Sequence, residues 1–144
     1  MATVELRFSA LPEHVRTARL VAAAVARRAG VDESLLDEVR LAVGEACSRA
    51  VGLHQRSGLN GAVRVALIEE EKRFLIEVED EAGPIGGSAG GGGAGEAEGD
   101  ADGGEDVLGL AVITGLVEDV EVGNGNEGGL IRMSWPVSTT SVGV

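Results

Sequence analysis

One long helical repeat constrains this fold more than any other feature of the sequence. Between residues 33 and 55, apolar side chains recur at every third or fourth position, at Leu35, Val39, Ala42, Ala46, Ala50 and Leu53. This period places them on one face of an α-helix. Asp32 can cap the helix, the acidic residues of its first turns suit the positive end of the helix dipole, and the turn residues 57–61 end it. The sequence therefore predicts an amphipathic helix over residues 33–55.

The other periodic segments divide into strands and helices. Apolar and polar residues alternate over residues 4–8, which indicates an edge or near-edge strand, and Pro12 and Gly30 suit the two ends of a helix over 12–29. Further patterns predict a hairpin of strands 63–70 and 73–80, a helix rather than a strand over 107–117, a strand beginning at Val120 and a last strand over 130–137. This order predicts an α+β fold, a two-layer sandwich with helices packed on one face of a mainly antiparallel mixed sheet.

Length and composition favour one domain over residues 1–144. Aromatic residues make up only 2% of the sequence, so the core is expected to consist of Val, Leu, Ile and Ala. Segment 86–104 is almost wholly Gly, Ala, Asp and Glu, with no branched apolar residue to offset the entropy lost on ordering. We expect a flexible loop there, and we favour disorder over a lid that closes on a ligand.

The formal net charge of −12 weighs against two classes of partner. Nucleic acid and anionic membrane surfaces both attract Lys and Arg, so binding to neither is expected. A basic protein partner is compatible with this charge, as is a role in solubility alone. The sole cysteine, Cys47, excludes an internal disulfide and is expected to be a buried packing residue. Because the sequence has no leader pattern and no apolar run of membrane-spanning length, we expect a cytoplasmic protein.

Three short segments carry residue patterns that occur together at nucleotide sites. The first is Glu45-Ala-Cys-Ser-Arg49-Ala50 on the long helix, the second is Asp80-Glu-Ala-Gly83-Pro84 after a strand, and the third is Val107-Leu-Gly109-Leu110 at a helix start. In this order they resemble the boxes of the GHKL (Bergerat-fold) ATPases, and most closely those of the small bacterial anti-sigma factors with serine kinase activity. The resemblance covers nearly the whole chain and implies a GHKL ATPase-like fold.

The resemblance implies roles for four residues in binding ATP. Glu45 would be the base that activates a substrate serine, and Asp80 would accept a hydrogen bond from the adenine amino group. Gly83 would permit close approach of the base. Gly109 would begin a helix whose backbone N–H groups hold the phosphates.

Two departures from the family pattern fall where phosphates would bind. Arg49 stands where the family has an Asn that helps to hold Mg²⁺, and Val107 replaces the first glycine of the third box. Because a guanidinium offers donors only, metal-assisted phosphoryl transfer is expected to be impaired. We favour an exposed ion pair between Arg49 and Glu45, worth about 0.2–0.5 kcal/mol, over direct contact of Arg49 with phosphates. Either arrangement would neutralise Glu45, and His54 is expected to be partly exposed and uninvolved.

The resemblance implies three alternative functions. The first is an anti-sigma-factor-like regulatory protein that binds a sigma factor, an anti-anti-sigma antagonist of the STAS-domain kind, or both, with weakened or lost ATP and Mg²⁺ chemistry. The second is an active ATP-dependent serine/threonine kinase that phosphorylates the antagonist. The third is a degenerate GHKL domain with a structural or dimerising role, so a homodimer stays open. Any ATP binding is expected to be weak or independent of metal.

Overall fold

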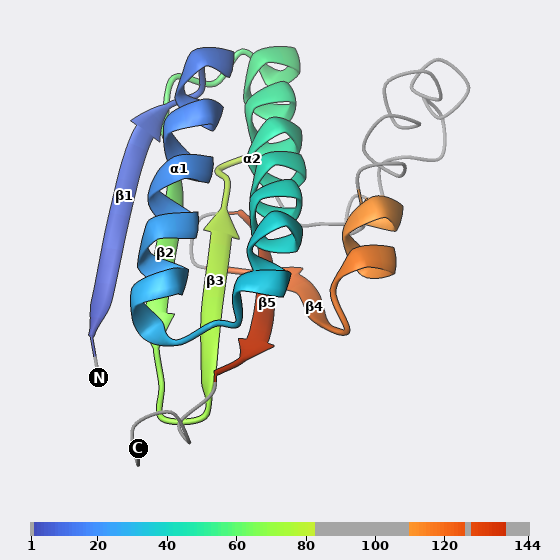
Figure 1. Ribbon diagram of the computed structural model, residues 1–144. Coiled ribbons are helices and arrows are strands. Elements are labelled where there is room, and N and C mark those ends of the chain that lie inside the picture. Colours follow the sequence, from blue (N-terminus) through green and yellow to red (C-terminus); the bar gives the residue numbers. More distant parts are fainter. Residues whose placement is uncertain (1, 83–109, 126–127, 138–144) are drawn as a thin grey trace, which may run out of the picture.

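The computed structural model describes residues 2–82, 110–125 and 128–137, which form a layer of helices on one face of a sheet (Figure 1). In chain order the elements are β1 (Thr3–Ser9), α1 (Pro12–Ala29), the 3₁₀ turn η1 (Glu33–Leu35), α2 (Leu36–Ser57), β2 (Ala62–Glu69), β3 (Arg73–Glu79), β4 (Asp119–Asn124) and β5 (Gly129–Pro136). Residues 110–116 are also helical. The predicted flexible loop, 86–104, lies outside the described residues.

The sheet has five strands in the order β1-β2-β3-β5-β4, and each pairing is antiparallel. The first strand lies at one edge, as its alternating pattern predicted. Helices α1 and α2 run side by side across the same face of the sheet (Figure 1). The predicted α+β class and two-layer arrangement are therefore confirmed.

The helix ends follow from the residues that the sequence places there. Gly30 ends α1 in the left-handed conformation, with φ of 108°, where a residue without a Cβ carries no steric penalty. Asp32 accepts a hydrogen bond from the Ser34 N–H at 2.8 Å. This cap begins η1 rather than the α-helix itself, so the helix predicted from residue 33 has a first turn of 3₁₀ geometry before α2 begins at Leu36.

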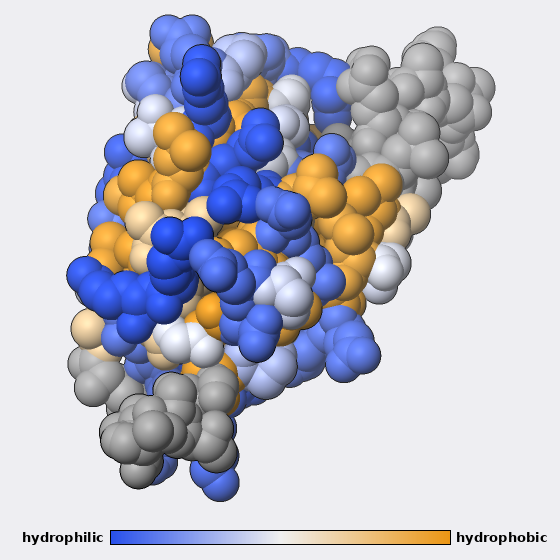
Figure 2. All heavy atoms as spheres, in the orientation of Figure 1, coloured by the Kyte–Doolittle hydropathy of each residue, from blue (hydrophilic) through white to orange (hydrophobic). Residues whose placement is uncertain are grey.

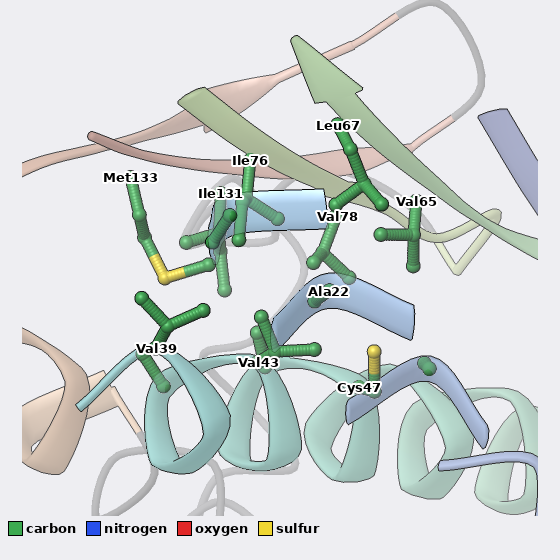
Figure 3. Packing of buried hydrophobic residues seen from close by; sticks show 14 of the residues in the cluster. Ala22, Val39, Val43, Cys47, Val65, Leu67, Ile76, Val78, Ile131 and Met133 are labelled. Atoms are coloured by element: carbon green, nitrogen blue, oxygen red, sulfur yellow. The ribbon is translucent and has the colours of Figure 1, made fainter. Parts of the chain in front are cut away.

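The core lies between the inner face of α2 and the central strands. Figure 3 shows Val43 and Cys47 of α2 pointing toward Ile76 and Val78 of β3. Cys47 is fully buried, and this desolvation raises the pKa of its thiol to about 12, as befits the packing role predicted for it. The core is not purely aliphatic, however, because Phe74 and Trp135 are also buried in it.

The opposite face of the sheet carries alternating charges. Arg64 of β2 bonds Glu5 of β1 at 2.7 Å, and Arg132 of β5 lies 2.8 Å from Glu77 of β3 and 3.5 Å from Glu121 of β4. Charged pairs of this kind on neighbouring strands suit a solvated sheet face. The pattern explains why both long helices cover the other, apolar face. Among the described residues, none of the helices is long and apolar enough to cross a membrane.

Candidate functional site

Asp80 lies directly after β3 and has a fixed, buried carboxylate. Its residue is 2% exposed, and Oδ1 accepts hydrogen bonds from the N–H groups of Ala82 at 2.8 Å and Gly129 at 3.2 Å. The Asp80 backbone N–H donates to the Gly129 carbonyl at 3.0 Å. A Cβ at Gly128 would come within 2.3 Å of the Asp80 carbonyl oxygen, so close packing of the two segments needs a glycine there. Within the described part of the chain, these contacts leave Oδ2 as the carboxylate oxygen without a backbone donor.

Arg49 of α2 directs its guanidinium toward that oxygen. Its Nη1 lies 3.7 Å from Asp80 Oδ2, and the Arg49 side chain is only 7% exposed. The distance makes an ion pair but exceeds a hydrogen bond. The Nε of Arg49 is buried and has no hydrogen-bond partner among the residues that the structure describes. The site therefore contains a buried cation whose donors are incompletely used.

The exposed ion pair predicted between Glu45 and Arg49 does not form. Both residues lie on α2, but Arg49 is paired with Asp80 instead. The physical reason is orientation, because the Arg49 side chain points into the interior, where an anchored carboxylate attracts it more strongly than a half-exposed one. Glu45 is half-buried and is not neutralised by its neighbour, contrary to expectation.

His54 is a buried part of the site's framework rather than the partly exposed, uninvolved residue predicted. Its exposure is 0%, its Nε2 accepts the Glu81 N–H at 2.9 Å, and its Nδ1 lies 3.1 Å from the Gly61 carbonyl oxygen. Since Nε2 accepts, Nδ1 must carry the proton and donate to Gly61. The neutral ring thus ties the last turn of α2 to the residue that follows Asp80.

A signal in the sequence could have identified His54. The apolar stripe of the helix passes through Ala46 and Ala50, and the next position at this spacing is residue 54. The prediction continued the stripe to Leu53, which is only half-buried. A histidine in line with a buried stripe indicates a ring whose nitrogens have partners in the interior.

The structure brings Arg49 and Asp80 together, although they are 31 residues apart in the sequence, and places Glu45 one helical turn before Arg49. The other predicted site residues, Gly83 and Gly109, lie outside the described residues. So does Val107. The suggested contacts of these three positions with a nucleotide remain predictions.

The resemblance implies that ATP and Mg²⁺ bind here, and Arg49 fits the first but not the second. A buried guanidinium with an unpaired Nε–H is a donor that phosphate oxygens can accept, so Arg49 fits the phosphates of ATP. It does not fit Mg²⁺, because a guanidinium is permanently protonated and has no lone pair to give to a metal. If Arg49 occupies the position of the family's Asn, as the resemblance implies, the site would supply its own positive charge instead of sharing a metal.

Comparison with known proteins gives a consistent result. A family model described as the histidine kinase-like ATPase domain matches residues 8–135. Two curated relatives are both named serine-protein kinase RsbW. The relative from Bacillus pumilus (strain SAFR-032) is 34% identical over 82 residues, which are 56% of this chain and 51% of the relative. That from Bacillus subtilis (strain 168) is 33% identical over 78 residues, 54% of this chain and 49% of the relative.

The chain thus spans about half the length of the curated relatives that it matches. A crystal structure of the RsbU and RsbW domains of a Mycobacterium tuberculosis protein is similar in fold, with a TM-score of 0.65 and 16% identity. That similarity covers 95% of this chain and 33% of the other. The resemblance inferred from the three sequence boxes is confirmed by the family match, which extends over most of the residues from β1 to β5. The chain belongs to the histidine kinase-like ATPase domain family.

Proposed function

We propose that this protein is a regulator of the anti-sigma-factor type, which binds a sigma factor, a STAS-domain antagonist, or both, and has weakened ATP and Mg²⁺ chemistry. Two curated relatives named serine-protein kinase RsbW support the regulatory class. The observation that carries the weakened chemistry is the burial of Arg49 against Asp80. By the resemblance, Arg49 stands where the family has its metal-binding Asn, and its donor-only side chain supports the weakened chemistry.

The chemical consequence follows from how phosphoryl groups are transferred. Enzymes of this kind act mainly by positioning and by electrostatic stabilisation, in which bound metal neutralises charge on the phosphates. Arg49 supplies charge but cannot share a metal with the nucleotide. Binding of a partner protein needs only the scaffold and its surfaces, so that role survives the substitution.

One observation favours the second candidate, an active ATP-dependent serine/threonine kinase. Because Arg49 pairs with Asp80, the Glu45 carboxylate is not neutralised by an ion pair with Arg49. Glu45 is therefore free to serve as the base that activates a substrate serine. Weak kinase activity is the form of this candidate that agrees best with a preserved base and a lost metal ligand.

The helical layer offers a surface for a protein partner. Figure 2 shows apolar patches among polar side chains on this side of the molecule, and large apolar residues exposed on its helices include Leu20 at 59%, Leu41 at 52% and Val112 at 43%. A protein partner covers apolar side chains of this kind at the centre of an interface. The net charge of −12 suits a partner whose contact surface is basic.

Binding assays with purified proteins test the regulatory role. Each sigma factor and STAS-domain protein encoded by the source genome is titrated into this chain by calorimetry, and we expect at least one to bind. Leu20→Ser and Leu41→Ser should weaken that complex, whereas Val122→Ser, which alters an apolar residue of β4 that is 42% exposed, should not. Absence of binding by the whole set would refute the proposed role.

A homodimer through β1 is the assembly that the sheet edges favour. An antiparallel two-fold pairing centred on Leu6 would place Glu5 opposite Arg7 of the second copy, and Arg7 opposite Glu5 of that copy. At the other edge, β4 has Asp119 and Glu121 on one face, so the same operation would oppose like charges. Light scattering should give a dimer for the wild type and a monomer for Arg7→Glu, with the dimer restored by Glu5→Arg/Arg7→Glu. A monomeric wild type would refute this assembly.

A further inference from the structure

The guanidinium of Arg49 has a two-donor edge that no described residue uses. Its side chain is 7% exposed, and Nη1 is the atom that faces Asp80, at 3.7 Å from Oδ2. The Nε–H and one Nη2–H point together along the other edge of the planar group, in the geometry that receives two oxygens of one anion. The Nε on this edge is buried, and no residue in the described ranges accepts its N–H.

Asp80 does not serve as the missing acceptor. Its Oδ1 already accepts N–H groups from Ala82 and Gly129, which hold the carboxylate in place. Its Oδ2 stands beyond hydrogen-bond distance from Arg49 and faces Nη1 rather than Nε. The contact therefore orients the guanidinium without using its free edge. Buried polar groups in folded proteins almost always have a partner, so the orphaned Nε is a donor for which the described residues supply no acceptor, and a ligand can supply one.

We propose that Arg49 forms a metal-independent oxyanion site for the phosphate groups of a nucleotide. This inference rests on the proposed function only in taking the GHKL pocket as the place where a nucleotide binds. The free edge of Arg49 binds two oxygens of one phosphate group, and its permanent positive charge replaces part of the charge that Mg²⁺ supplies in other members of the family. Asp80 holds the guanidinium in position from the opposite side.

The charges around Arg49 limit which ligands can bind. Arg49 is the sole cation that the structure describes beside Asp80, while Glu45 adds a second carboxylate on the same helix. The net local charge is thus negative, which limits affinity for a polyanion and makes the fork geometry decisive. A free polyphosphate has the same chemistry as the phosphate chain of ATP, so the experiment must separate these two sources.

The test uses the full chain in buffer with excess EDTA and measures melting temperature and calorimetric affinity for ATP, tripolyphosphate and adenosine. We expect the wild type to bind ATP without metal. Arg49→Met, which keeps length but removes charge and donors, should weaken ATP binding by roughly 10- to 100-fold. Arg49→Lys, which keeps the charge but not the fork, should have an affinity for ATP between those of the wild type and Arg49→Met. Arg40→Met is the matched control, since Arg40 lies on the same helix and, among the described residues, pairs with exposed Asp37.

Comparison of the ligands identifies the source of the phosphate. If tripolyphosphate binds, and its affinity falls in Arg49→Met, the result supports the oxyanion site and shows that it recognises phosphate alone. If ATP binds but tripolyphosphate does not, the result supports the site and shows that it also requires the nucleoside. Adenosine affinity should be the same in the wild type and Arg49→Met. A second readout is the ¹⁵N resonance of Arg49 Nε–H. This resonance is assigned as the one that is missing from the spectrum of Arg49→Lys, and it should shift when ATP is added.

Several results would overturn the inference. They are equal ATP affinity in the wild type and Arg49→Met, ATP binding that requires Mg²⁺, an unshifted Nε–H resonance at saturating ATP, or no binding of any ligand to the wild type. Unfolding of Arg49→Met would leave Arg49→Lys and the resonance to decide. None of these results bears on partner binding, so failure of the oxyanion site and failure of the regulatory role are distinguishable.

Discussion

Replacement of His54 with Leu tests whether the histidine ring holds the segment that presents Asp80. Leu fills much of the space of the ring but forms no hydrogen bonds. The Gly61 carbonyl and the Glu81 N–H, now bonded to the ring at 3.1 Å and 2.9 Å, would each lose a partner. A buried group left without a partner costs about 1–3 kcal/mol. Because Gly61 and Glu81 are themselves only half-buried, we expect a total loss of about 2–4 kcal/mol in the free energy of unfolding.

A second substitution divides this loss between the two bonds. The side-chain amide nitrogen of Asn can take the position of Nδ1 and donate to the Gly61 carbonyl, but Asn has no atom in the place of Nε2. His54→Asn should therefore lose only the bond to Glu81, at a cost of about 1–2 kcal/mol. His14 of α1 provides the control, since it is half-exposed and its ring lies near that of Phe8, with centroids 5.9 Å apart. His14→Leu should change stability by less than about 0.5 kcal/mol.

Urea unfolding of the variants measures these differences, provided that the slopes against urea concentration are equal. Hydrogen exchange at the Glu81 amide gives an independent local readout, because this N–H should exchange faster in both His54 variants than in the wild type. A His54→Leu protein as stable as the wild type, with unchanged exchange at Glu81, would show that the ring is a packing residue and that its two bonds position nothing.

Three smaller predictions follow from single contacts. Gly128→Ala should destabilise the protein by about 1–3 kcal/mol in urea unfolding, because its Cβ would fall 2.3 Å from the Asp80 carbonyl oxygen. The Cys47 thiol should react with a disulfide reagent at pH 8 only after unfolding, since burial raises its pKa to about 12. Hydrogen bonds from the backbone and side chain of Ser34 lower the pKa of Asp32 below its ordinary value of 3.8. Its contribution to stability is therefore present above about pH 4 and is lost as pH falls through the lower folded pKa, so Asp32→Ala should destabilise the protein more at pH 7 than in acid.

Local patterns predicted most of the fold because the fold depends on local properties. The alternation in β1 and the spacing in α2 indicate which side chains are buried. Gly30 and Gly58 end the two helices, and both have left-handed backbone angles, with φ of 108° and 67°. The order of these elements then limits the packing to one arrangement of layers. None of this reasoning required knowledge of a contact between distant residues.

The site was harder to predict because its main contact is not local. Arg49 has two carboxylates within reach, Glu45 one turn away on the same helix and Asp80 on another element. A rule for helix neighbours considers only the first. Which carboxylate is chosen depends on the rotation of α2 against the sheet, and that rotation is fixed by the buried face of the whole helix. Sequence alone supplies the residue types, but only the packed structure supplies the pairing.

On the proposed function, the pairing of Arg49 with Asp80 rather than with Glu45 would separate two roles, that of a metal ligand and that of a catalytic base. A metal ligand and a catalytic base normally serve one reaction, so loss of the ligand is expected to relax selection on the base. Here the substituted side chain is held by Asp80, through a buried contact at 3.7 Å, and it leaves the Glu45 carboxylate without an ion pair to it. A cation beside Glu45 would have stabilised its charged form and made it a poorer base. On the proposed function, Glu45 would still be able to accept a proton although Arg49 cannot share a metal, and the ligand bound at the free edge of Arg49 would decide which of these properties matters.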